Sequence, residues 1–177
     1  MKSLQPASAA IVRAVLGVVV LATGTLAGAA DLKVTESVTV AASPAKVWAV
    51  VGNFSGLSGW HPAVAATDIV KGADNKVGAV RTVTTKDGAR LVEELLAYDA
   101  RRHAMTYRIT ESPLPVTHYV STLSVAPSGA GAVVTWKSTF KRDRNAKDVD
   151  DAKAKEIVAG IYTAGFDGLR TALGDAR

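Results

Sequence analysis

The sequence contains no cysteine. Disulfide bonds, thiolate nucleophiles, cysteine-ligated metals and lipid attachment through a cysteine are therefore excluded. Stability has to come from an ordinary packed core. A chain of 177 residues, 48% of them hydrophobic, is long enough to bury one.

Signals for metal, phosphate or nucleophile chemistry are also scarce. The three histidines, His61, His103 and His118, do not have metal-ligand spacing, so we expect no metal and no cofactor. No serine lies in a G-x-S-x-G context. The glycine-containing run 72–78 lacks the Gly-Lys-Ser/Thr ending of a phosphate loop, and we interpret it as a hairpin turn.

The charge balance is only mildly basic. The 21 Lys and Arg residues exceed the 16 Asp and Glu residues, and two of the bases, Lys2 and Arg13, lie in the first thirty residues. The other bases are spread along the chain, whereas nucleic-acid-binding proteins usually gather them on one face. We therefore expect no nucleic-acid partner.

Residues 1–30 have the pattern of a secretory signal peptide. A basic start is followed by the uncharged run Ala14 to Ala30, which ends in small residues. We expect cleavage before Ala30 or Asp31, a periplasmic or secreted protein, and no stable membrane insertion afterwards. A retained membrane anchor stays an alternative, because the run approaches the length that spans a bilayer. Residues 31–177 then form a single domain.

The order of patterns after residue 31 predicts the fold. Val34, Val38 and Val40 alternate with polar residues as in a half-buried strand, and Ser43-Pro44 is a typical helix start. Helical segments are expected at 44–53 and 55–60, and strands at 63–71, 77–85, 89–98, 103–111, 117–126 and 132–142. Apolar residues at three- and four-residue steps predict one long helix over 148–173.

This order predicts an α+β helix-grip fold. A curved antiparallel sheet of about seven strands would wrap around the C-terminal helix and leave a ligand cavity between them. The helix contains Gly160, Gly165 and Gly168. We expect glycines that face the sheet to leave space for a ligand.

Several short motifs together resemble the SRPBCC superfamily, which includes START-like, birch-pollen-allergen-like and polyketide cyclase/dehydrase-like proteins. The resemblance covers Lys33 to Leu173 and implies the same helix-grip fold around a ligand cavity. The motifs are Val47-Trp48 with Gly52-Asn53-Phe54, Trp60-His61-Pro62, the run 77–81, Glu93-Glu94-Leu95, the run 114–119 and Val134-Thr135-Trp136. The Ser-Gly-Leu-Pro-Ala gate of the plant abscisic-acid receptors is missing, because residues 86–90 read Lys-Asp-Gly-Ala-Arg.

Strand parity predicts part of the cavity wall. Lys137 must reach water, so Trp136 points inward, and an outward Arg108 places Met105 and Tyr107 inside. The resemblance adds Tyr119 and Ser121, as well as Arg81 and Glu93. A wall of aromatic side chains with a few polar groups is typical of small-molecule sites.

Arg81 and Glu93 are expected to meet inside the protein, on neighbouring strands, with Glu94 facing solvent. An isolated buried charge is too costly to keep, so each needs the other. We expect an internally satisfied structural pair, and the alternative is an anchor for a ligand carboxylate or carbonyl. His61, which the resemblance places at the cavity entrance, is expected to be an exposed loop histidine; an acid–base role is the alternative.

These features favour an exported binding protein that encloses a hydrophobic small molecule or lipid. The predicted site consists of His61, Arg81, Glu93, Met105, Tyr107, Tyr119, Ser121 and Trp136. One alternative is a cyclase or dehydrase that uses Tyr107, Tyr119 or His61 as acid–base groups and Arg81 to polarise a carbonyl. Another, implied by the resemblance, is an accessory protein that acts by contact with a periplasmic redox enzyme.

Overall fold

One antiparallel sheet of seven strands organises the protein. The computed structural model describes residues 30–174. The strand order across the sheet is β1-β7-β6-β5-β4-β3-β2, so β1 and β2 form its two edges. The strands are β1 (Leu32–Val40), β2 (Val64–Lys71), β3 (Val80–Thr85), β4 (Arg90–Asp99), β5 (Ala104–Glu111), β6 (Val116–Ser128) and β7 (Gly131–Arg142).

Within residues 30–174, three helices complete the fold, and the caps of the two α-helices follow from the sequence. Helix α1 (Pro44–Val51) begins where the Lys46 amide donates to Ser43 Oγ at 3.4 Å, and the 3-10 helix η1 (Phe54–Gly59) follows it. Helix α2 (Asp151–Leu173) begins where the Lys153 amide donates to Asp150 Oδ1 at 2.7 Å. It ends at Gly174, whose φ of 71° is the left-handed conformation that glycine adopts without strain.

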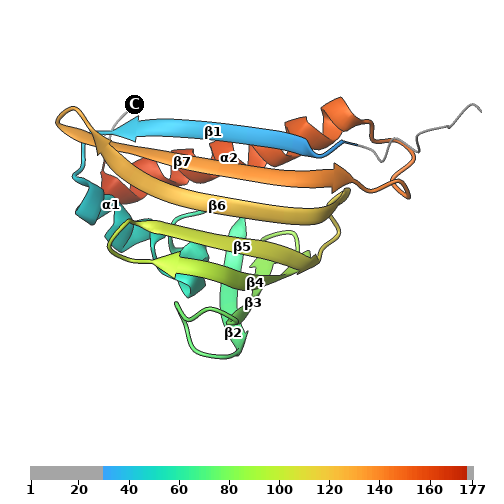
Figure 1. The fold of residues 1–177 in the computed structure, drawn as a ribbon, viewed down its shortest axis with the longest axis horizontal. Coiled ribbons are helices and arrows are strands. Elements are labelled where there is room, and N and C mark those ends of the chain that lie inside the picture. The colour runs from blue at the N-terminus through green and yellow to red at the C-terminus, as the bar shows by residue number, and fades with distance from the viewer. Residues whose placement is uncertain (1–29, 175–177) are drawn as a thin grey trace, which may run out of the picture.

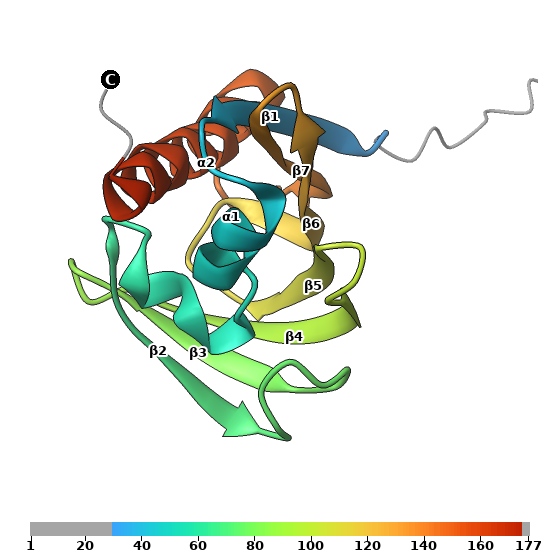
Figure 2. The same cartoon turned by 90° about the vertical axis from the view of Figure 1, so that its left-hand side faces the viewer.

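The sheet is strongly curved, and α2 runs along its concave side (Figure 1). Seen from one end, the strands turn through an arc from β1 to β2, and α1, η1 and α2 lie across the open side of that arc (Figure 2). The helix-grip fold predicted from the element order is confirmed.

The core lies between the concave face and the helices. The predicted alternation of β1 holds, since Val34, Val38 and Val40 are buried. Tyr162, Leu169 and other residues of the apolar stripe of α2 are buried against the sheet. The strands thus present one apolar face to α2 and one polar face to solvent.

Element boundaries differ from the predicted ones by a few residues. β3 begins at Val80 rather than residue 77, because the chain is still turning at Gly78, whose φ is 85°. α2 begins at Asp151 rather than residue 148 because Asp150 caps it. The predicted signal peptide lies outside the described residues except for Ala30. Within residues 30–174, no helix combines the length and apolar character needed to cross a membrane.

Candidate functional site

An apolar cavity of about 120 Å³ lies between the concave face of the sheet and α2. Strands β2 to β7, α2 and the segment around η1 all contribute to it. Its apolar lining includes Val64, Val83, Leu91, Ile109, Val158 and Ile161. Its polar and aromatic lining includes His61, Glu93, Tyr107, Tyr119, Trp136 and Tyr162.

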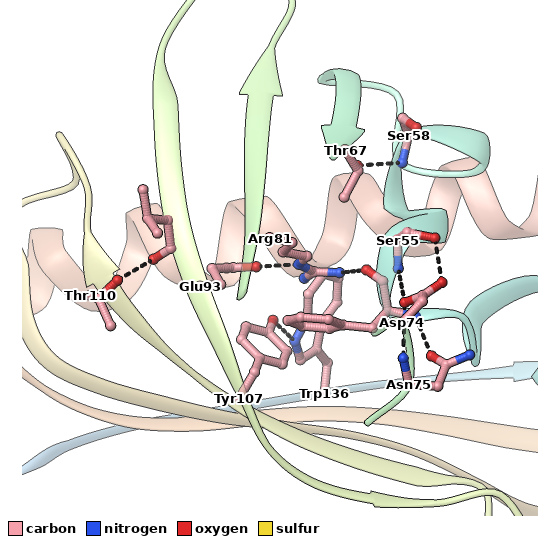
Figure 3. Close-up of polar contacts among 12 residues, drawn as sticks. Ser55, Ser58, Thr67, Asp74, Asn75, Arg81, Glu93, Tyr107, Thr110 and Trp136 are labelled. Carbon is pink, nitrogen blue, oxygen red and sulfur yellow. Dashed lines mark hydrogen bonds and ion pairs between the residues drawn. The ribbon is translucent and has the colours of Figure 1, made fainter. Parts of the chain in front are cut away.

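Trp136 joins the sheet to α2 on the cavity wall. Its indole stacks on the ring of Tyr162, with the two centroids 4.4 Å apart and the planes at 12°. Its Nε1 donates to Tyr107 Oη at 3.0 Å (Figure 3). The inward orientation that strand parity predicted for Trp136 and Tyr107 is what the structure has. Together these three rings fix the position of α2 over the sheet.

A chain of hydrogen-bonded hydroxyl groups continues beside these rings, and its partners fix the direction of hydrogen-bond donation. Ser121 Oγ donates to the Lys137 carbonyl oxygen at 3.0 Å, so its one proton is used. It must therefore accept from Tyr162 Oη, which lies 3.1 Å away. Tyr162 in turn accepts from Tyr119 Oη. The chain thus runs from Tyr119 through Tyr162 and Ser121 to a backbone carbonyl.

Burial raises the pKa of each cavity tyrosine, because it disfavours the phenolate. Tyr107, Tyr119 and Tyr162 are all nearly inaccessible to solvent. Their hydroxyls are therefore protonated at neutral pH. They act as hydrogen-bonding groups there, and none is poised to serve as a base.

Arg81 and Glu93 form a buried ion pair at the cavity wall, of which Glu93 is part. They are directly opposite in the β3–β4 register, and Arg81 Nε lies 2.6 Å from Glu93 Oε2 (Figure 3). Arg81 and Glu93 are only 3% and 5% exposed. Glu94, the next residue of β4, faces outward and pairs with the exposed Arg108 at 2.6 Å. The predicted pair and the outward orientation of Glu94 match the structure.

The guanidinium of Arg81 has further partners that the sequence did not reveal. Nη1 donates to the carbonyl oxygen of Phe54, at the start of η1. The guanidinium carbon lies 4.2 Å from the centre of the Phe54 ring and 5.1 Å from that of Tyr107. Arg81 is thus held by a carboxylate, a backbone carbonyl and two aromatic rings.

The loop between β2 and β3 fixes the backbone of η1 where Arg81 binds it. The Phe54 amide donates to Asn75 Oδ1 at 2.8 Å, and Ser55 Oγ donates to Asp74 Oδ2 at 2.6 Å (Figure 3). The sequence of residues 72–78 predicted only a hairpin turn. Their Asp and Asn side chains also cap a second segment, which positions the Phe54 carbonyl for Arg81.

His61 is buried, with 4% exposure, so the expectation of an exposed loop histidine is wrong. Its Nε2 lies 3.0 Å from the Ile161 carbonyl oxygen of α2, which can only accept, so Nε2 carries the proton. Its Nδ1 accepts from the Ala63 amide at 3.2 Å. Burial lowers the pKa of His61, and the ring is neutral at neutral pH. Both nitrogens are occupied, which leaves neither free for acid–base chemistry.

The predicted site residues therefore fall into two groups. Glu93, Tyr107, Tyr119, Trp136 and His61 line the cavity. The other three are buried outside the lining: Arg81 and Met105 border a separate void of about 10 Å³, and Ser121 is hydrogen-bonded behind Tyr162.

The predicted cavity lay between the sheet and the C-terminal helix, but no residue of α2 or η1 was among the predicted site residues. Tyr162, Ile161 and Val158 of α2 line the cavity, and so does Leu57 of η1. The three α2 residues belong to the apolar stripe that predicted the helix, so the signal was present. The apolar stripe alone does not indicate which of its residues face the cavity and which pack in the core.

Two of the three glycines of α2, Gly165 and Gly168, do not leave empty space. A Cβ on Gly165 would lie 2.9 Å from atoms of both His61 and Trp136, and one on Gly168 would lie 2.0 Å from the Trp60 carbonyl oxygen. Nothing lies within 4 Å of the corresponding position on Gly160. The expectation of glycine-made space is therefore wrong for the two glycines that face the core, since Gly165 and Gly168 allow Trp136 and the segment 60–62 to approach the helix closely.

Among residues 30–174, no group of three or more His, Cys, Asp or Glu side chains is arranged to hold a metal ion.

A curved sheet that closes an apolar cavity with one long C-terminal helix is the helix-grip fold of the SRPBCC superfamily. Residues 31–174 match the family described as "Polyketide cyclase / dehydrase and lipid transport". The chain belongs to this family. A search of curated proteins found no match.

Solved structures agree with this assignment. The chain is similar to the protein XoxI from Bacillus cereus, with 30% identity and a TM-score of 0.72 over 81% of this chain and 96% of that one. An uncharacterised protein from Bacillus thuringiensis also has 30% identity, with a TM-score of 0.71 over 80% and 98% of the two chains. Ara h 8.0201 shares the fold at 18% identity, with a TM-score of 0.64 over 82% and 99% of the chains.

Proposed function

We propose that this chain is an exported protein that binds a compact hydrophobic molecule between the sheet and α2. The observation that carries the proposal is the apolar cavity, which lies where a helix-grip fold can enclose a ligand. Leu91, Ile109, Leu114 and Ile161 belong to its lining and are only half-buried, so this part of the lining is partly accessible to solvent. The family description, which includes lipid transport, supports the same class of function.

The cavity volume limits the size of the ligand. About 120 Å³ is smaller than a typical drug-sized site of roughly 300–1,000 Å³, while a dry cavity of about 150 Å³ binds benzene. The ligand that fits is a molecule of about one ring, or the end of a longer isoprenoid or acyl chain. Such a ligand would contact Trp136 and the cavity tyrosines directly.

Export is the second part of the proposal. It is supported by the basic start, uncharged middle and small-residue end of residues 1–30. After cleavage, the remaining chain would begin close to β1.

Native mass spectrometry of the protein purified from the periplasm or medium of its own host tests both parts. We expect a polypeptide lacking about thirty residues, together with a retained mass that organic extraction removes. A full-length species confined to membranes would contradict export. A ligand-free protein that also binds no added hydrophobic compound would contradict the binding function.

A further inference from the structure

We propose that the cavity selects ligands bearing a hydrogen-bond donor, an alcohol or an amine on a compact apolar body, and rejects carboxylates. The inference rests on the proposed binding function of the same cavity. It reverses the polarity of the alternative considered from the sequence, in which Arg81 would anchor a ligand carboxylate.

The charge on the cavity wall is negative and favours a ligand that is not an anion. Glu93 is the one formally charged side chain among the described residues that line the cavity. Its partner Arg81 is outside the lining and is turned toward Phe54, whose carbonyl and ring it contacts. An anionic ligand would meet the carboxylate without access to the balancing cation. Like charges brought together in a poorly solvated site repel strongly.

His61 supplies no positive charge to compensate Glu93. It lines the cavity, but its Nδ1 accepts the Ala63 amide and its Nε2–H donates to Ile161. A proton on Nδ1 would break the contact with Ala63. The ring therefore stays neutral and has no free donor for a ligand anion.

The direction of the hydrogen bonds in the hydroxyl chain also favours a ligand that donates. Since Tyr119 gives its proton to Tyr162, the Tyr119 oxygen keeps lone pairs but no free proton. It can accept from a ligand and cannot donate to one. Tyr119 and Glu93 thus both favour a ligand that donates.

Tyr107 adds the complementary contact. Its oxygen accepts from Trp136 Nε1 and still carries its own proton. A ligand hydroxyl can donate to Glu93 or Tyr119 and also accept from Tyr107. An alcohol can therefore satisfy groups of both kinds on this wall.

The test uses four probes with similar one-ring bodies: toluene, benzyl alcohol, benzylamine and benzoate. Their affinities for the wild-type protein are measured at pH 7.5 by isothermal titration calorimetry. We expect toluene to bind, benzyl alcohol to bind more tightly, and protonated benzylamine to bind at least about tenfold more tightly than benzoate. Benzoate binding as tightly as benzylamine would overturn this inference while leaving the binding function intact. Failure of all four, toluene included, would overturn both.

Two single variants test whether the Glu93 carboxylate determines the preference for benzylamine over benzoate. Glu93→Gln should strengthen benzoate and weaken benzylamine, because Arg81 then becomes the uncompensated charge. Glu94→Gln is the matched control, since Glu94 is the adjacent carboxylate and pairs outward with Arg108. It should leave all four affinities unchanged.

Loss of one partner of the buried pair can unfold the protein, so a second variant is needed. The double variant Arg81→Met/Glu93→Leu removes both charges together. In the folded double variant, the preference for benzylamine over benzoate should disappear. An unchanged preference would show that Glu93 does not set the polarity of the cavity.

Discussion

Arg81 Nε lies 2.6 Å from Glu93 Oε2 across the β3–β4 ladder, yet only Glu93 borders the cavity. The pair is therefore one-sided: its negative member meets the ligand space, while its positive member is enclosed by Phe54 and Tyr107. Three protein elements hold the arginine. Its principal role is consequently to balance the charge of a buried carboxylate on the cavity wall.

The first prediction concerns the stability of this pair. Arg81→Met and Glu93→Leu should each lower the free energy of unfolding by about 3–5 kcal/mol, because each strands a buried charge. The double variant should recover much of that loss, since neither charge remains. Denaturant unfolding of the four proteins measures the coupling. Strictly additive losses would mean that the two side chains do not interact.

The second prediction is a pH dependence that arises from His61. Its pKa is lowered by burial, so below the ordinary value of 6.5 the unfolded chain takes up a proton more readily than the folded one. The contribution of His61 to stability is complete above pH 6.5 and is lost as the pH falls toward the lowered pKa.

Thermal unfolding between pH 7.5 and 5 measures this effect. His61→Gln should flatten the loss of stability on acidification, even if it lowers stability at pH 7.5. His118→Asn is the control, because His118 is exposed and Asn tolerates its φ of 53°. Equal acid dependence in wild type and His61→Gln would show that His61 is not the buried neutral group described above.

The third prediction compares two glycines of α2. Gly160→Ala should stabilise the protein by up to about 1 kcal/mol, because the site is open and alanine is the better helix former. Gly168→Ala should instead destabilise it by about 1–3 kcal/mol, since the new Cβ would lie 2.0 Å from the Trp60 carbonyl oxygen. Chemical denaturation distinguishes the two. A stabilising Gly168→Ala would mean that α2 does not approach Trp60 this closely.

The fourth prediction tests the direction of the hydroxyl chain. Tyr162→Phe removes the central group and leaves the proton of Tyr119 without an acceptor, at a cost of about 1–3 kcal/mol. Tyr119→Phe removes only the first donor, and the remaining contact of Tyr162 with Ser121 is kept. Its cost in unfolding free energy should be smaller. The reverse order of the two costs would contradict the derived direction.

The alternation of residues along the strands predicted which strand side chains point into the cavity. The outward Lys137 and Arg108 fixed the parity of their strands, and parity placed Trp136 and Tyr107 correctly. This placement follows from the two-residue period of a strand, which the sequence displays directly. The inward positions of Arg81 and Glu93 were instead implied by the resemblance to the SRPBCC superfamily, and the antiparallel register brings the two residues together.

Contacts between distant segments could not be predicted in this way. His61 is buried because its ring bonds a carbonyl of α2, one hundred residues later in the chain. Arg81 turns away from the cavity because the Phe54 carbonyl, twenty-seven residues earlier, is held in place by Asn75. Nothing in the local sequence around His61 or Arg81 indicates either partner. The burial of His61 and the orientation of Arg81 away from the cavity therefore follow only from the assembled fold.

The most direct test of the account is a toluene titration followed by methyl NMR, with wild type compared to two matched variants. Val83→Phe adds volume inside the cavity, whereas Val92→Phe adds it to the opposite side of the sheet. We predict saturable shifts confined to lining methyls such as Val83, Ile109 and Ile161 in the wild type, retained in Val92→Phe and lost in Val83→Phe. Absent shifts, or shifts that persist unchanged in folded Val83→Phe, would contradict a ligand site between the sheet and α2.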